Sequence, residues 1–180
     1  MIDTGSIQKW IAGDAETPRW YAIRTAPRRE FRACSELSSR GMEAYLPSYG
    51  NKRQWSDRAK VIEQPLFPGY LFCRFPLADR VRILESPGVR QIVGIGKTPA
   101  PIQEHQIDNL RAMVASRHQL APWPYLNAGQ RIHIVRGPLA GVRGFVVRAE
   151  EGAVRVVASL DLLQRSVAAV IEREWIGVVG

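Results

Sequence analysis

The sequence predicts an α+β fold in which helices pack against a mainly antiparallel sheet, followed by a small β-barrel. Up to residue 118, stretches rich in aromatic and β-branched residues alternate with stretches of helical apolar spacing. Beyond residue 128, short apolar stretches of alternating pattern are separated by glycines, which is typical of a barrel. We therefore expect a tail over 1–18, a sheet-and-helix domain over 19–118, a proline-rich linker over 119–127 and a barrel over 128–180.

The first domain opens with a predicted strand at Trp20–Thr25 and a helix that begins near Pro27 and ends at Gly41. The residues spaced to face the core from that helix are Phe31, Cys34 and Leu37. The arginines expected on its solvent side are Arg28, Arg29 and Arg32. The strands expected next are Met42–Tyr49, Gly69–Phe75 and Val89–Ile95, and the further helices are Ala78–Ser86 and Ile102–His118.

Four features carry more specific expectations. The basic stretch Gly50–Lys60 is either a long hairpin or a flexible loop. Gly69–Phe75 is apolar except for Arg74, which favours a central place in the sheet. The residues at helical spacing in the last helix are Ile107, Leu110 and Val114. The glycines expected to supply positive φ in the barrel turns are Gly137, Gly141, Gly144 and Gly152.

The charge is large and unevenly placed. The formal net charge is +8 and the isoelectric point is near 10.1, which favours a polyanionic partner such as nucleic acid, a ribonucleoprotein or an anionic membrane surface. Residues 19–60 hold ten Lys and Arg against four Asp and Glu, so they carry +6 of the +8. The basic surface is therefore expected in the N-terminal half.

Several classes of protein are excluded. The stretch Gly94–Pro99 resembles the end of a phosphate-binding loop, but Gln91 stands where that loop needs a glycine. The three histidines lack the spacing of metal ligands, and no nucleophile motif is present, so we expect neither an enzyme nor a cofactor. Cys34 and Cys73 are expected to be reduced. Without a signal peptide or a long apolar run, the chain is expected to be soluble and cytoplasmic, without membrane contact.

The stretch "PLFPGYLFCRF", Pro65–Phe75, places three aromatic residues around a Pro68-Gly69 break. Either these aromatics are core, or some of them await a partner. Alternation along a strand puts Tyr70 and Phe72 on one face and Leu71 and Cys73 on the other. Because one face must pack on the helices, only one can be a docking surface.

Four motifs together resemble the NusG family of transcription elongation factors over about Trp20 to Val179. They are "WYAI", "PLFPGYLF", "PGVRQIVGIG…PAPI" and "AGQRIHIVRGPLAGVRGFVV", in this order. The resemblance implies an N-terminal NGN domain joined to an SH3-like KOW barrel. It also implies a monomer that docks the β′ clamp helices of RNA polymerase, bridges toward the β subunit and suppresses pausing.

By that resemblance, each candidate residue receives a role. The polymerase pocket would involve Phe67, Tyr70, Phe72, Ile107 and Leu110. The basic residues and one tryptophan near nontemplate DNA would be Arg28, Arg29, Arg32, Arg53, Trp55, Arg58 and Lys60. The residues of the KOW turns are Gly137, Pro138, Gly141 and Gly144, and those that contact Rho or a small-subunit ribosomal protein are Leu162 and Leu163. Each role has an alternative. The pocket aromatics could all be core, the basic residues could form a solvated helix face, and both leucines could be core.

The subtype follows from the motif details. "QPLFPGYLFCRF" and the basic stretch before it are similar to specialised relatives such as RfaH, which favours an operon-specific antiterminator. RfaH carries an aromatic residue where Arg24 stands here, so that edge of the pocket differs. The Val-rich, Gly-punctuated C-terminal segment favours a stable barrel over the helical form known for RfaH. The alternatives are a general elongation and termination factor, or a KOW-containing ribosomal or RNA-binding protein.

Overall fold

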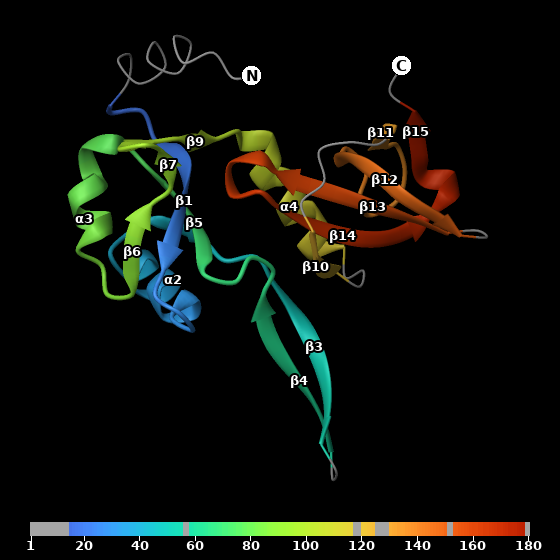
Figure 1. The fold of residues 1–180 in the computed structure, drawn as a ribbon, viewed down its shortest axis with the longest axis horizontal. Helices are drawn as coiled ribbons and strands as arrows, with labels where there is room; N and C mark the ends of the chain where they lie inside the picture. The colour runs from blue at the N-terminus through green and yellow to red at the C-terminus, as the bar shows by residue number, and fades with distance from the viewer. Residues whose placement is uncertain (1–14, 56–57, 117–119, 125–129, 151–152, 179–180) are drawn as a thin grey trace. The chain divides into compact units, whose positions relative to one another are not determined.

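The computed structural model describes residues 15–55, 58–116, 120–124, 130–150 and 153–178 (Figure 1). The chain divides into two compact units. The first comprises Met1–Leu46 and Gly69–Ile102, and the second comprises Pro47–Pro68 and Gln103–Gly180. This grouping cuts across the predicted domain of residues 19–118, because its middle and its last helix group with the C-terminal strands.

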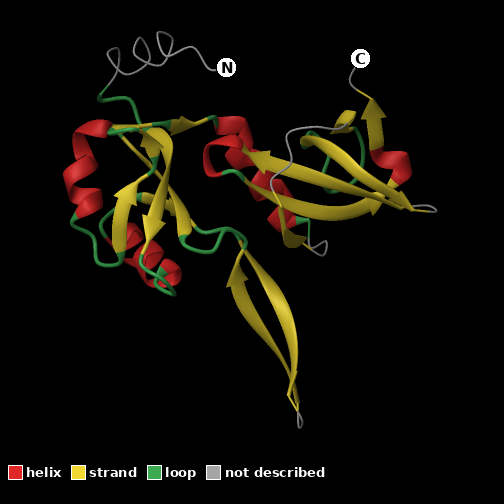
Figure 2. Cartoon of the chain, viewed as in Figure 1, coloured by secondary structure: helices red, strands yellow, loops and turns green. Residues whose placement is uncertain are grey.

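The first unit is built on a five-stranded antiparallel sheet in the order β2-β5-β1-β6, with β9 also paired to β1 (Figure 2). Its strands are β1 (Arg19–Thr25), β2 (Glu43–Tyr45), β5 (Tyr70–Phe75), β6 (Val89–Ile92) and β9 (Pro101–Ile102). Its helices are α2 (Glu30–Ser39), the 3-10 turn η1 (Leu77–Asp79) and α3 (Arg80–Leu84), and a small hairpin joins β7 (Gly94–Ile95) to β8 (Thr98–Pro99). The predicted central position of the apolar strand is confirmed, since β5 lies between β2 and β1.

Helices α2 and α3 bury one face of this sheet. The core there consists of Tyr21, Ile23, Ala33, Leu37, Leu71, Cys73, Phe75 and Ile83. The rings of Tyr21 and Phe75 lie 4.8 Å apart between centroids. Leu71 and Cys73 therefore face the helices, and the alternation predicted for this strand assigns Tyr70 and Phe72 to the opposite face.

Helix α2 is shorter than predicted at its start and ends as predicted. Arg28 takes the left-handed conformation, with φ +59°, so the helix begins only at Glu30. At the other end Gly41 has φ +81°, and the Met42 N–H donates to the Leu37 carbonyl, which is the pairing of a Schellman motif. The prediction that Phe31 faces the core is wrong. Its side chain is 45% exposed. Leu37 lies in the core and Cys34 packs against it, as predicted, and Ala33 is buried beside them. Residues three apart drift around a helix of 3.6 residues per turn, so Phe31 lies at the edge of the inward stripe.

The second unit contains a two-stranded ribbon, one helix and a C-terminal sheet. The ribbon is β3 (Ser48–Trp55) with β4 (Arg58–Pro65), and the helix is α4 (Glu104–Ala115). The single strand predicted over Met42–Tyr49 is wrong: it divides into β2 and β3 around Pro47, a residue without the N–H that a continuous ladder needs. In α4 the buried residues are Ile107, Leu110 and Met113, whereas Val114 is half-buried. Within the described residues, no helix is long and apolar enough to cross a membrane.

The C-terminal sheet has six antiparallel strands in the order β10-β14-β13-β12-β11-β15. They are β10 (Leu120–Pro124), β11 (Gln130–Ile134), β12 (Arg143–Glu150), β13 (Ala153–Leu160), β14 (Arg165–Glu172) and β15 (Ile176–Val178), with 3-10 turns η2 (Asp161–Leu163) and η3 (Arg173–Trp175). Five of these strands lie in the segment predicted to form the barrel, residues 128–180. The sixth, β10, occupies the predicted linker and pairs with β14 from Leu120 opposite Ala169 to Pro124 opposite Arg165.

Candidate functional site

The end of β1 is held between two Pro-Gly turns, which we call the Pro-Gly clasp. The Thr25 N–H donates to the Gly69 carbonyl at 2.9 Å, and the next N–H, that of Ala26, donates to the Gly88 carbonyl at 2.8 Å. Gly69 has φ +85° and Gly88 has φ +89°, a conformation that L side chains rarely adopt. The two Pro-Gly pairs of the sequence therefore flank a single point of the backbone.

Glu30 adds a side-chain contact to one of these turns. Its Oε1 accepts a hydrogen bond of 2.8 Å from the Gly69 N–H, 39 positions along the chain. The residue is only 7% exposed, although it belongs to the first turn of α2. Gly69 is thus bonded on both sides, through its N–H to Glu30 and through its carbonyl to Thr25.

An outer row of three residues crosses the sheet next to this turn, on the face opposite α2 and α3. Arg24 on β1 lies opposite Tyr70 on β5 and opposite Gln91 on β6. Arg24 and Gln91 are exposed and Tyr70 is half-buried. This outer row offers a cation, a phenol and an amide to a partner.

Four of the five residues predicted for the polymerase pocket are buried. The exposed fraction is 1% for Phe67, 0% for Phe72, 0% for Ile107 and 1% for Leu110, and only Tyr70 is half-exposed. Of the two alternatives for the aromatic residues around the Pro-Gly break, burial in the core therefore applies to Phe67 and Phe72 in this structure. Large aromatic and aliphatic side chains gain most from burial, so they form core unless the backbone forces them outward.

The two predicted pocket residues of the first unit share a face of β5. Phe72 lies opposite Ala22 on β1 and opposite Tyr45 on β2, with the Phe72 and Tyr45 rings 6.5 Å apart. Tyr70 lies two positions away, in the outer row. The predicted alternation is therefore confirmed. Phe72 is buried beside the accessible outer row, on the same face of the sheet as Tyr70.

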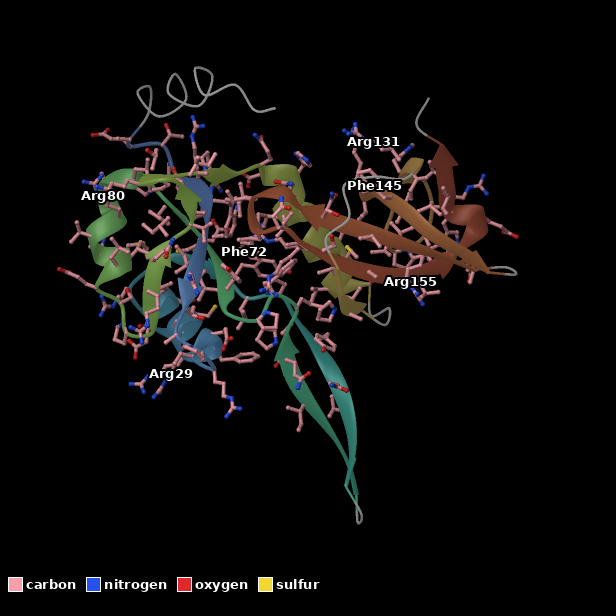
Figure 3. All side chains as sticks on the ribbon, viewed as in Figure 1. Arg29, Phe72, Arg80, Arg131, Phe145 and Arg155 are labelled. Atoms are coloured by element: carbon pink, nitrogen blue, oxygen red, sulfur yellow. The ribbon has the colours of Figure 1, made fainter. Side chains whose placement is uncertain are left out.

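The three predicted helix arginines are all accessible. Arg28 and Arg29 lie in the turn before α2 and Arg32 lies in its first turns, and all three are exposed. Arg29 projects outward from the α2 end of the first unit, whereas Phe72 lies inside (Figure 3). The exposed Phe31 stands between these arginines in sequence. Cations beside an exposed aromatic residue suit a nucleic-acid strand, since phosphates attract the cations and bases stack on the ring.

The four predicted DNA-binding residues of the basic stretch belong to the β3–β4 ribbon, so the hairpin alternative is confirmed over the flexible loop. The register places Arg53 opposite Lys60 and Trp55 opposite Arg58. Residues directly opposite each other share a face, and residues two apart on one strand share it as well. All four therefore fall on one face of the ribbon, and Lys52 falls on the other.

The base of the ribbon is fixed by hydrogen bonds on that same face. The Tyr49 hydroxyl donates to Gln64 Oε1 at 3.2 Å, and Asn51 Nδ2 donates to the same oxygen at 3.1 Å. On the opposite face, Ser48 donates to Glu63. A two-stranded ribbon is marginally stable in water by itself, so such cross-strand contacts help to hold its register.

The predicted turn residues of the C-terminal sheet have structural roles. Gly137 has φ +77°, and a Cβ there would lie 2.6 Å from the Trp175 ring; Gly141 has φ +91°. Gly144 was expected to supply positive φ, but it lies inside β12, where a Cβ would approach the Val157 carbonyl oxygen to 2.5 Å. Pro138 is exposed. Gly152 lies outside the described residues.

The two predicted partner leucines differ in accessibility. Both belong to η2, where Leu163 is 9% exposed and Leu162 is half-buried. Only Leu162 offers accessible apolar surface to a partner, and Leu163 contributes mainly to the core.

The cysteines are free thiols of the core, as expected. Burial raises the pKa of Cys73 to about 12, and the neighbouring Cys34 and Glu43 add to the rise. Burial also raises the pKa of Cys34, against a hydrogen bond from Ser38. Both groups therefore stay protonated at neutral pH, which opposes nucleophilic or metal-binding chemistry. The described residues contain no cluster of His, Cys, Asp and Glu that could hold a metal ion.

Three residues of the site were not among the predicted ones. Gln91 and Glu30 gave no local signal, because their importance depends on partners on distant strands. Phe31 was assigned to the core by helical spacing. Arg24 was noted for its position, but its place beside Tyr70 follows only from the β1–β5 register.

The comparisons with known proteins agree on one family. The family model NusG, "Transcription termination factor nusG", matches residues 18–111. The transcription termination/antitermination protein NusG of Thermus thermophilus is 24% identical over 163 residues, which cover 78% of this chain and 89% of that protein. The protein of the same name from Campylobacter jejuni is 28% identical over 141 residues, which cover 72% of this chain and 80% of that protein.

One solved structure supports the fold. "Domain interaction in Thermotoga maritima NusG" matches with a TM-score of 0.57 at 17% identity, covering 92% of this chain and 99% of that one. The family model spans more than half of the sequence and includes the Pro-Gly clasp, the outer row and the ribbon. The chain therefore belongs to the NusG family of transcription termination and antitermination factors, which are not enzymes.

Proposed function

We propose that this protein binds RNA polymerase and promotes processive elongation through terminators, as an operon-specific antitermination factor. The observation that carries the proposal is the placement of two accessible features at one backbone point. The outer row begins at Arg24, and the exposed arginines begin at Arg28, just after the clasp. One short segment can thus serve both a protein partner and a nucleic-acid strand.

The protein partner is proposed to be the β′ clamp helices, with a bridge toward the β subunit. An aromatic side chain at a half-exposed position gives a large contact area at a small entropic cost, and Tyr70 is such an anchor. Arg24 adds a cation able to pair with a carboxylate of the partner. The other residues predicted for the polymerase pocket are Phe67, Phe72, Ile107 and Leu110, and all four are buried, so Tyr70 is the accessible anchor of this proposal.

A pull-down with core RNA polymerase, followed by runoff transcription on a template with a terminator, tests this proposal. The wild-type chain should retain polymerase and increase readthrough. The double variant Phe67→Ala, Tyr70→Ala should lose both, while Val81→Ala, which alters a 55% exposed residue of α3, should keep both. Unchanged binding by a folded double variant would refute the docking role. Retention of ribosomal RNA alone would favour a ribosomal or RNA-binding protein.

The nucleic-acid partner is proposed to be the nontemplate DNA strand. The arginines of the first unit, Arg28, Arg29 and Arg32, would contact phosphates, and so would the one-sided cations of the ribbon, with Trp55 available to stack on a base. Cations on one face can act on the same strand together, whereas cations divided between faces cannot.

The two faces of the ribbon supply a matched test. Arg53→Gln and Lys52→Gln each remove one cation from adjacent positions, but the residues lie on opposite faces. Arg53→Gln should weaken binding to a single-stranded oligonucleotide about ten-fold more than Lys52→Gln does, and it should also reduce the salt dependence. Equal effects would mean that the ribbon acts only through net charge.

The C-terminal sheet is proposed to bind Rho or a small-subunit ribosomal protein through Leu162. A Leu162→Ser variant should lose that partner and keep polymerase, while Leu163→Ser should destabilise the sheet, since Leu163 is buried. Retained binding by a folded Leu162→Ser variant would contradict the assignment.

A general role is the second candidate, favoured by relatives named transcription termination/antitermination protein NusG. RNA profiling after deletion of the gene separates the two roles. Changes confined to one long operon support the specialised role, and changes in many terminated transcripts support the general one.

A further inference from the structure

We infer that Glu30 is a positioning residue for the polymerase-docking surface, because its carboxylate fixes the Pro68-Gly69 turn that sets the place of Tyr70. This inference rests on the docking role proposed above. Glu30 itself is buried and offers no surface to the polymerase. It would act entirely through the backbone that it holds.

The first argument is what else could hold the turn. A Cβ built on Gly69 would have no atom within 4 Å, so no side-chain packing restrains this residue on that side. Glycine is also the residue with the greatest backbone freedom. Two hydrogen bonds restrain Gly69 in the described part of the chain, one to Glu30 and one to Thr25.

The second argument is that the two hydrogen bonds of Gly69 hold different parts of its backbone. The Thr25 bond holds the Gly69 carbonyl and lies one step beyond the last pair of the β1–β5 ladder, Arg24 opposite Tyr70. The Glu30 bond holds the Gly69 N–H and is the link from this turn to α2. Losing it frees the peptide before Gly69 to rotate, while the ladder that defines β5 remains in place.

The third argument concerns the choice of a carboxylate. A buried carboxylate is costly unless it accepts hydrogen bonds, so its retention at 7% exposure points to a demand for an acceptor at this position. Hydrogen bonds to charged groups are also stronger than neutral ones. A glutamine keeps the acceptor oxygen without the charge, and a methionine of similar length keeps neither.

The test compares three variants of the full chain. Glu30→Met should weaken binding to core RNA polymerase about ten-fold. Glu30→Gln should keep most of the wild-type affinity, because its amide oxygen can still accept the hydrogen bond from the Gly69 N–H. Ile83→Val, a mild change of a 0% exposed core residue, is the control for lost stability, and it should leave the affinity unchanged. Hydrogen exchange of the Gly69 amide should be fastest in Glu30→Met.

The outcomes separate this inference from the docking proposal. If wild-type protein fails to bind polymerase, the docking proposal fails and the inference fails with it. If wild-type and folded Glu30→Met bind equally well, the inference alone is overturned. Equal losses in Glu30→Met and Glu30→Gln would also overturn it, because charge rather than the acceptor would then be responsible.

Discussion

The two turns of the Pro-Gly clasp have the same sequence pair and nearly the same backbone, but different surroundings. A Cβ on Gly88 would lie 3.3 Å from the Ala33 Cβ and 3.4 Å from the Arg29 Cβ, whereas a Cβ on Gly69 would meet nothing within 4 Å. Gly88 is thus packed against α2, whereas among the described residues the contacts that hold Gly69 are its hydrogen bonds to Glu30 and Thr25. The Gly88 turn is part of the packed core, and the Gly69 turn leaves room for a partner.

This difference shows why a Pro-Gly pair cannot be interpreted by itself. In both turns the proline restricts its own φ angle and the glycine after it supplies the left-handed conformation. Stability should depend mainly on the packed turn, and binding on the open one. Four measurements test this contrast.

The largest expected effect is that of Gly88→Ala on stability. The alanine would be strained in the left-handed conformation, and its Cβ would be crowded against α2. The free energy of unfolding should therefore fall by about 2 kcal/mol. Urea unfolding followed by circular dichroism measures it. A loss no greater than that of Gly69→Ala would remove the contrast between the turns.

Gly69→Ala should be milder for stability and stronger for binding. The open surroundings leave only the backbone strain, so the unfolding free energy should fall by about 1 kcal/mol. Polymerase affinity should fall more than in Gly88→Ala, because the turn carries Tyr70. Affinities ranked in the opposite order would show that the packed turn, not the open one, controls docking.

Arg28→Gly probes the third left-handed residue of this region. Glycine adopts φ +59° without strain but makes the unfolded chain more flexible, so stability should rise by about 0.5 kcal/mol. Binding to single-stranded DNA should weaken, because one exposed cation is lost. Arg32→Gly, inside α2, is the matched control and should lower stability by about 1 kcal/mol.

The effect that is smallest at neutral pH concerns Cys73 in the core of the first unit, and it becomes measurable only in alkaline solution. The raised pKa of Cys73 means that the folded state holds its proton more tightly than the unfolded state. Its contribution to stability is complete below pH 9 and is lost as the pH rises toward 12. The alkaline decline in unfolding free energy should therefore be shallower in Cys73→Ala, while both turn variants should keep the wild-type slope.

Local patterns predict much of this fold. Alternation and glycine punctuation identify β1, β5 and five strands of the C-terminal sheet, because each pattern is contained within its own segment. Gly41 correctly marks the end of α2 for the same reason. Tyr70 and Phe72 are also assigned correctly to one face of their strand.

Features that depend on distant partners are not predictable in this way. The bond from Glu30 to Gly69 spans 39 positions, and neither residue signals the other. Phe31 has the spacing of a core residue, but it lies at the edge of the inward stripe of α2 and is exposed. The segregation of Arg53 and Lys60 on one ribbon face likewise depends on a register that composition does not encode.

The pairing of β10 with β14 has a practical consequence for dissecting the protein. A fragment that begins at residue 128, where the pattern places the barrel, would strip β10 away and leave β14 as a bare edge strand. That edge includes Val167, Ala168 and Ala169, which are buried in the intact chain, and uncovered apolar edges are sites of aggregation and strand exchange. A soluble C-terminal fragment should therefore start ahead of Leu120, so that the prolines of β10 continue to close the sheet.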